Sequence, residues 1–346
     1  MVPPLLLSTA ACADLRRTQG LASKLAAAQA NPGPYASPAG PAPPAPTAAP
    51  PQPVPPAHDP TTDANMILQV LEEGVRDQNI TAFFPAGSLP PIAQRIAQSG
   101  ALTRLAKDWK LPLEIAMDLA RLALFDTVLY LDDSASMAFP EWQGARLDEL
   151  RFVVGRIATA AGLFDADGIQ VRWMNSKKEG NGYTTQQQAL DLISKVKFNR
   201  GTPLGTSLHE KVLEPLVLKP AKKNKLKKPV LIVIVTDGAP TGEPKDTIVR
   251  VIKSAQDALD KTPYTADAVS FQLAQCGDDQ GAREFLEFCD EHPQIGSLVD
   301  TTSGFESEQD NFSKAVPPLH LTREMWLAKL LLGPIHSGWD AADEKK

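Results

Sequence analysis

The sequence predicts an α/β fold: a doubly wound, mostly parallel sheet with helices on both faces. From Phe125 onward, short apolar runs alternate with segments whose apolar residues recur at helical spacing. The runs are almost continuously apolar, without the alternation of polar and apolar residues that a half-exposed strand shows. Each strand is therefore expected to be buried on both faces, which requires a layer of helices on either side of the sheet.

Residues 1–61 are expected to form a disordered, Pro/Ala-rich N-terminal region. Between residues 31 and 60 proline recurs at every second or third position, and few side chains there are suited to a core. The first residues, MVPPLLLSTAACA, end in small side chains as a signal peptide does, but they lack basic residues. The three cysteines are too few for a disulfide framework. We therefore expect an intracellular, cytoplasmic protein, with secretion as the alternative.

Residues 62–124 are expected to form a helical prefix. Apolar residues follow helical spacing in residues 65–75 and 113–124. Two shorter helices, punctuated by proline, are expected between them in PAGSLPPIAQRIA and ALTRLAKDWKLP.

Residues 125–333 are expected to form the α/β domain. Its strands are expected at 125–131, 168–174, 229–235, 268–275 and 297–300. Its helices are expected at 147–164, 185–196, 204–216, 246–259 and 280–290. A last helix is expected to begin after Thr322, to end at Gly333 and to cover the sheet with its apolar face. Residues 334–346 are expected to form a loose tail.

Oxygen-bearing side chains follow the strands at the sheet edge where ligands bind in such folds. Asp132, Ser134 and Ser136 come directly after the first strand, where alternate residues of an extended chain point to one side. Asp237 follows the most apolar strand, and Thr202 lies just ahead of a helix. Hydroxyls and carboxylates without sulfur or imidazole favour a hard cation, namely Mg²⁺, Mn²⁺ or Ca²⁺. The sequence therefore predicts a metal site made by these five residues.

The segment from Phe125 to about residue 332, about 60% of the chain, resembles a von Willebrand factor A domain. LDDSASM resembles the D-x-S-x-S strand end of that family, GTPLGTSL its threonine loop and VTDG its second aspartate turn. The resemblance implies a metal-ion-dependent adhesion site with all five positions filled. Integrin-type domains carry a further acidic pair after this motif, but here only Glu141 is present, so no adjacent second metal site is expected. The proline-rich front and helical prefix also resemble those of fungal proteins with one such domain.

In that family an Asp or Glu of a partner completes the coordination of the metal. The resemblance therefore implies a metal-dependent protein–protein interaction module, not an enzyme, whose partner presents an acidic side chain. Two alternatives remain: a structural scaffold with a metal-stabilised edge, and a magnesium-dependent hydrolase. A hydrolase needs a positioned base and extra positive charge, and the sequence has no Walker-type phosphate loop, G-x-S-x-G or H-E-x-x-H motif.

Charge and hydropathy narrow the range of partners. The formal net charge of −6 is spread along the chain, so neither nucleic acid nor an anionic membrane is an expected partner. No apolar run reaches the roughly 18 residues of a membrane span. A run of lysines between residues 219 and 228 is interpreted as a solvated loop, and the sequence leaves the oligomeric state open.

The predicted site also leads to two expectations about stability. Asp132 and Asp237 repel each other when no cation lies between them, so removing either carboxylate should cost little in metal-free buffer. Thr202 is expected to carry an exposed loop hydroxyl, which is removable without harm to the fold.

Overall fold

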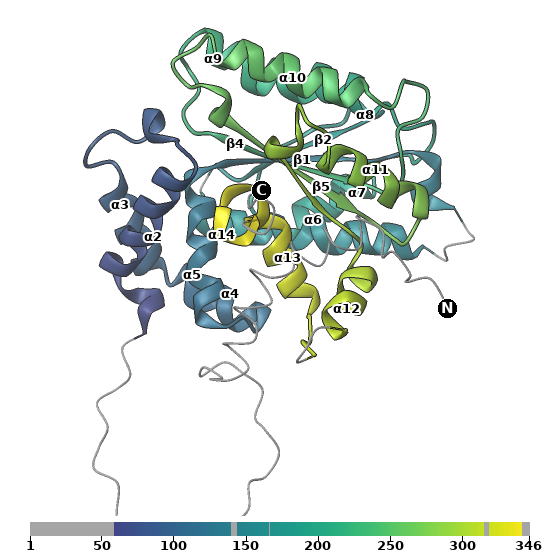
Figure 1. Cartoon of the computed structure of the whole chain (residues 1–346). Helices are drawn as coiled ribbons and strands as arrows, with labels where there is room; N and C mark the ends of the chain where they lie inside the picture. The colour runs from purple at the N-terminus through teal and green to yellow at the C-terminus, as the bar shows by residue number, and fades with distance from the viewer. Residues whose placement is uncertain (1–58, 140–143, 166, 315–317, 341–346) are drawn as a thin grey trace, which may run out of the picture.

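One six-stranded sheet organises the computed structural model, which describes residues 59–139, 144–165, 167–314 and 318–340 (Figure 1). The strands are β1 (Asp126–Leu131), β2 (Ile169–Trp173), β3 (Gly180–Tyr183), β4 (Val230–Thr236), β5 (Val269–Gln275) and β6 (Val299–Thr302). Their order is β3-β2-β1-β4-β5-β6. Only β3 runs antiparallel to its neighbour, while the other described pairs are parallel. The predicted doubly wound, mostly parallel sheet is therefore confirmed.

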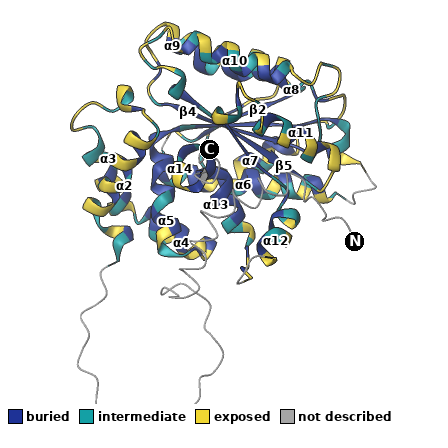
Figure 2. Cartoon of the chain, viewed as in Figure 1, coloured by how far each residue is buried: buried dark blue, intermediate teal, exposed yellow. Residues whose placement is uncertain are grey.

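Both faces of the sheet are covered by helices, which explains the apolar strands (Figure 2). In β4 all seven residues are buried, and successive side chains pack into opposite layers because a strand has a period of two. Leu231 and Val233 join the core on one face, while Ile232 and Ile234 join the core on the other.

The two helical layers come from different parts of the chain. One layer contains α6 (Ala145–Phe164), α7 (Gln186–Ile193) and α13 (Arg323–Leu332). The other contains α8 (Leu204–Leu208), the π-helix η6 (His209–Leu218), α9 (Lys219–Lys222), α10 (Thr247–Leu259) and α11 (Gln280–Asp290). The last predicted helix begins as expected, because the Thr322 hydroxyl accepts a hydrogen bond from Met325 N at 3.2 Å. Its Trp326 and Leu330 are buried against the sheet layer.

The helical prefix packs into the same core as the sheet. Its α-helices are α2 (Ala64–Asp77), α3 (Leu89–Ser99), α4 (Ala101–Trp109) and α5 (Leu113–Asp118). Its 3₁₀ turns are η1 (Pro60–Thr62), η2 (Thr81–Phe83) and η3 (Leu119–Leu124). The predicted helix over 113–124 is thus divided into α5 and η3. Because Leu71 and Trp109 share one buried cluster with Leu129 of β1, the prefix is a further layer on the α6 face.

One strand, one helix and three short turns were not predicted. The edge strand β3 was missed because its sequence, GNGY, carries no apolar alternation and pairs through its backbone. Helix α12 (Phe305–Ser313) was missed because most of its side chains are polar. The short turns η4 (Ala135–Ala138), η7 (Ala266–Ala268) and η8 (Gly296–Leu298) were not predicted either.

The predicted loose tail is wrong for residues 334–340. This stretch forms η9 (Gly333–Ile335) and α14 (Ser337–Asp340), and it returns to the helical prefix. Ile335 and Trp339 are buried, and the Trp339 indole donates a hydrogen bond to Asp118 Oδ2 at 3.0 Å. Burial of these two apolar side chains stabilises the packed arrangement. Residues 341–346, and the predicted disordered region up to residue 58, lie outside the described residues.

The described region begins at Asp59, slightly ahead of the predicted boundary at residue 62. The Asp59 carboxylate accepts a hydrogen bond from Thr61 N at 2.9 Å and caps η1. Across the described part of the chain, every helix is too short or too polar to span a membrane.

Candidate metal centre

The predicted metal residues lie at the point where the strand order of the sheet reverses. The chain builds outward from β1 to β2 and β3, and then crosses to β4 on the other side of β1. In doubly wound sheets the carboxyl ends of the two central strands diverge there and leave room for a ligand. Asp132 follows β1 and Asp237 follows β4, and Asp132 N still donates to Val235 O at 2.9 Å.

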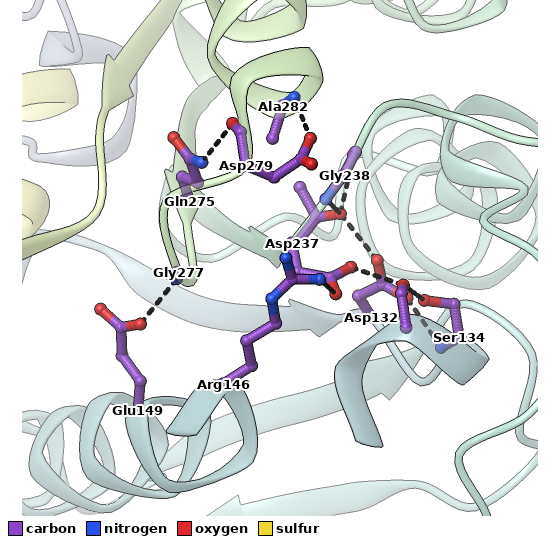
Figure 3. A network of polar contacts seen from close by, with 12 residues as sticks. Asp132, Ser134, Arg146, Glu149, Asp237, Gly238, Gln275, Gly277, Asp279 and Ala282 are labelled. Carbon is purple, nitrogen blue, oxygen red and sulfur yellow. Dashed lines mark hydrogen bonds and ion pairs between the residues drawn. The ribbon is translucent and has the colours of Figure 1, made fainter. Parts of the chain in front are cut away.

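Four of the five predicted residues form one chain of contacts. Ser134 N donates to Asp132 Oδ1 at 2.8 Å, and the hydroxyls of Ser134 and Ser136 lie 3.0 Å apart. The Ser136 hydroxyl in turn donates to Asp237 Oδ1 at 2.9 Å. Figure 3 shows Asp132, Ser134 and Asp237 facing one another from two neighbouring strand ends. Asp132, Ser134 and Asp237 are buried, whereas Ser136 is partly exposed and is the most accessible of the four.

Asp133 points away from this group, as expected for the intervening residue. Its Oδ1 accepts hydrogen bonds from Asn175 N at 2.7 Å and Asn175 Nδ2 at 3.1 Å, and its Oδ2 accepts from Ser176 N at 2.8 Å. The buried carboxylate therefore fixes the loop after β1 to the loop after β2, and is satisfied there by amide groups.

Thr202 lies between the loops that carry the other predicted residues. Its N–H donates to the Thr241 hydroxyl at 2.8 Å, and its carbonyl accepts from Thr241 N at 3.0 Å. Two residues earlier, the Arg200 carbonyl accepts from Ala135 N at 3.1 Å. The threonine loop is therefore attached to both site loops, through Thr202 to the loop after β4 and through Arg200 to the loop after β1. The expectation of an exposed hydroxyl is wrong, because Thr202 is only 4% exposed.

Glu243 anchors the same threonine loop, and sequence reasoning missed it. Its carboxylate accepts hydrogen bonds from Gly205 N at 2.6 Å, from Thr206 N at 3.0 Å and from the Thr206 hydroxyl at 2.6 Å. The two N–H groups lie at the start of α8, where a negative charge is favoured. No local pattern points to this capping group, since it lies far along the chain from the helix that it caps.

Arg146 is the second residue that sequence reasoning missed. From the first turn of α6 its guanidinium forms a buried ion pair with Asp237 Oδ2, as Figure 3 shows. Asp237 thus presents Oδ1 to Ser136 and Oδ2 to Arg146. One sequence signal exists: Arg146 has the spacing of a core position, because Leu150, Val153 and Ile157 follow it on the buried side of α6.

A glycine gives the Arg146 side chain its space. Gly277 has a φ of +76°, and a Cβ there would lie 3.0 Å from Arg146 Nε and 3.3 Å from its Cγ. The Gly277 N–H donates to Glu149 Oε2 at 2.8 Å, one helical turn beyond Arg146 (Figure 3). The loop after β5 is thereby held against α6 and alongside the ion pair.

Burial raises the pKa of one acid of the site, Asp132, and of Glu149 beside the site. The pKa of Asp132 is raised to about 6, mainly by burial and additionally by repulsion from Asp237, against the hydrogen bond that it accepts from the Thr236 hydroxyl at 2.7 Å. Burial likewise raises the pKa of Glu149 to about 7, while the bond from Gly277 N acts in the opposite direction.

The oxygen donors of the site fit a hard divalent cation that is bound by few negatively charged ligands. Among the described residues no three His, Cys, Asp or Glu side chains cluster as a metal site, and the candidate here has only two carboxylates beside its hydroxyls. Such oxygens suit Mg²⁺, Mn²⁺ or Ca²⁺. Arg146 partly neutralises Asp237, which lowers the attraction for any cation. Glu141, the acid considered for a second site, lies outside the described residues.

No protein-family model and no curated protein matches the chain. The fold and the contacts define a doubly wound α/β protein with a cluster of hydroxyl and carboxylate oxygens at its switch point.

Proposed function

We propose that the protein is a metal-dependent protein-binding module of the von Willebrand factor A type. The observation that carries the proposal is the chain of contacts from Asp132 through Ser134 and Ser136 to Asp237 at the switch point of the sheet. These residues, together with Thr202, would hold a divalent cation. When bound, the cation supplies a position that accepts a carboxylate oxygen from a partner protein.

The charges of the site support a carboxylate as the ligand. Asp132 and Asp237 are the two acids, and the ion pair with Arg146 offsets one of them. The hydroxyl donors are neutral, so a divalent cation held by this set keeps one net positive charge. An acidic side chain of a partner neutralises that charge, which a neutral side chain cannot do.

The ion pair also argues against the scaffold alternative. Arg146 already joins α6 to the end of β4 through Asp237, and Ala135 N already joins the first loop to Arg200 O. The edge therefore has internal contacts that hold it without a cation. The hydrolase alternative lacks support in the sequence, which offers none of the phosphate-loop or nucleophile motifs.

We further propose a cytoplasmic location. Cys276 and Cys289 are both buried and free of disulfide bonds, which suits a reducing compartment. Nucleic acid and membranes are not proposed as partners.

Calorimetric titration with Mg²⁺ tests the cation site. The test compares wild type with Thr202→Val, which keeps the size of a buried side chain but removes its hydroxyl, and with Thr202→Ser, which keeps the hydroxyl. Wild type and Thr202→Ser should bind the cation at one site, and Thr202→Val should bind it more weakly. Equal affinities for all three proteins would remove Thr202 from the site.

Partner capture in Mg²⁺ and in chelator tests the function. Partners retained by wild type in Mg²⁺ should be lost in chelator and with Thr202→Val, and they should remain with Thr202→Ser. If chelated wild type and Thr202→Val both retain every partner, the proposed function fails even where the metal binds.

A further inference from the structure

A strongly basic pocket of about 380 Å³ lies beside the candidate metal centre. It has five exposed cationic side chains: Lys177, Lys178, Lys195, Lys197 and Arg200. The single acid in its lining, Asp133, is buried and already accepts hydrogen bonds from Asn175 and Ser176. The pocket is therefore a concentration of positive charge on a protein whose formal net charge is −6.

The pocket is held in shape by hydrogen bonds from two lysine side chains to backbone carbonyls. The Lys178 ammonium donates to the Lys195 carbonyl, so the turn after β2 is bound to the segment after α7. Below the turn, Lys211 Nζ donates to the carbonyls of Trp173 at 2.8 Å, Met174 at 2.7 Å and Ser176 at 3.1 Å. The backbone around the pocket therefore loses little conformational freedom when a ligand binds, whereas the exposed lysine side chains become ordered on binding.

The pocket and the metal centre share two walls. Asp133 lines the pocket and stands between Asp132 and Ser134 in the first site loop. Arg200 lines the pocket two residues before Thr202, and its carbonyl accepts from Ala135 N at 3.1 Å. Arg200 also has a φ of +76°, an uncommon conformation for a residue with a side chain, and such strain gathers at functional loops.

The side chains that line the pocket favour carboxylates as ligands. They are less suited to stacking a nucleic-acid base or to holding a phosphate through a planar guanidinium. Lysine is a mobile point charge that suits an irregular row of carboxylates, whereas fixed bidentate recognition of phosphate favours arginine. Of the described residues that line the pocket, none is aromatic, so no ring is available for stacking a base.

We propose that this pocket binds the acidic flank of the partner segment whose leading carboxylate enters the metal centre. The partner is then a peptide segment with several Asp or Glu residues in succession. The inference rests on the proposed function for the role of the leading carboxylate. The pocket itself attracts the flanking acids whether or not a cation is present.

Fluorescence anisotropy with a labelled oligoglutamate peptide tests the proposal on the full chain, in Mg²⁺ and in EDTA. Lys195→Ala/Lys197→Ala should weaken binding roughly tenfold in both buffers, because two charge contacts are removed. The matched control is Lys223→Ala/Lys225→Ala, with the same charge change on exposed residues ahead of the amino-terminal end of β4. The control should bind like wild type.

The results distinguish the failure of the proposed pocket from the failure of the proposed metal-dependent function. Unchanged binding by Lys195→Ala/Lys197→Ala, or equal loss in the control, overturns the pocket whatever Mg²⁺ does. Binding that is lost in the pocket variant but indifferent to EDTA and to Thr202→Val supports the pocket and overturns the metal-dependent function. Displacement of the peptide by a single-stranded oligonucleotide at lower concentration than by unlabelled oligoglutamate overturns the assignment to acidic peptides.

Discussion

Arg146 and Asp237 form a buried ion pair between the first turn of α6 and the end of β4. The side chains of the two residues are 6% and 0% exposed. Because the guanidinium contacts Oδ2, the other carboxylate oxygen stays available to the Ser136 hydroxyl at 2.9 Å. The two acids of the candidate metal centre therefore differ: Asp237 has a cationic partner, while Asp132 is buried among hydroxyl and amide donors.

Because of this difference, we no longer expect that removing either acid costs little folding stability. In Asp237→Asn the guanidinium of Arg146 stays buried beside a neutral amide, which should lower the free energy of unfolding in EDTA by about 3 kcal/mol. Urea unfolding in metal-free buffer measures the loss. Arg146→Met/Asp237→Asn, which removes both charges, should recover part of it. An unchanged urea midpoint for Asp237→Asn would show that the pair contributes nothing.

Asp132→Asn should raise the free energy of unfolding in metal-free buffer, whereas Asp237→Asn lowers it. The folded pKa of about 6 is above the ordinary value of 3.8, so the folded state binds the proton more tightly than the unfolded state does. The stability from this group is present below pH 3.8 and is lost as the pH rises through about 6. At pH about 7.5 the amide variant should be more stable than wild type by about 2 kcal/mol, and near pH 4 the two should agree.

Thermal melts across this pH range, with and without Mg²⁺, check both halves of that prediction. Mg²⁺ should raise the melting temperature of wild type through binding to the folded state, and it should do little for Asp132→Asn. A variant that is less stable than wild type at every pH would show that the Asp132 carboxylate is a structural cap.

The strands and the local site motif were predictable because their signals are local. β4 is buried on both faces, and its nearly continuous run of apolar residues indicates this burial directly. Asp132, Ser134 and Ser136 lie within five residues. The backbone is extended as far as Ser134, as the sequence predicts, but Ser136 lies in the short turn η4 and is directed to the group by that turn. The edge strand β3 could not be found, since GNGY pairs through backbone groups that every sequence has.

The remaining parts of the site depend on packing between distant segments. Arg146 has the spacing of a core residue, but its ion pair requires that α6 lie beside the end of β4. Thr202 is buried because the loop after β4 folds over it through Thr241. Trp339 packs against the prefix, where Asp118 accepts a hydrogen bond from its indole. Such contacts are products of the tertiary fold.

Gly277→Ala tests whether the space beside Arg146 matters. A Cβ at this position faces Arg146 Nε at 3.0 Å, and the φ of +76° adds backbone strain. The control is Gly242→Ala, which has a similar φ of +82° but no heavy atom within 4 Å of the added Cβ. The control should lose about 1 kcal/mol, and Gly277→Ala should lose more. Equal losses in urea unfolding would show that the Arg146 side chain adapts without cost.

Glu243→Ala should weaken both the fold and the metal centre. The carboxylate of Glu243 receives Gly205 N, Thr206 N and the Thr206 hydroxyl, and these bonds hold the start of α8 directly after Thr202. Without them, orphan N–H groups at the helix start must be satisfied by water, which should cost about 1 to 2 kcal/mol of folding stability. The affinity for Mg²⁺ should fall as well, because Thr202 is then less firmly placed.

The matched control for the change in charge is Glu210→Ala, since Glu210 is an exposed acid on the following helix η6. Urea unfolding in EDTA and Mg²⁺ titration separate the two effects, and a Glu243→Ala protein that matches Glu210→Ala in both measurements would show that the threonine loop needs no anchor.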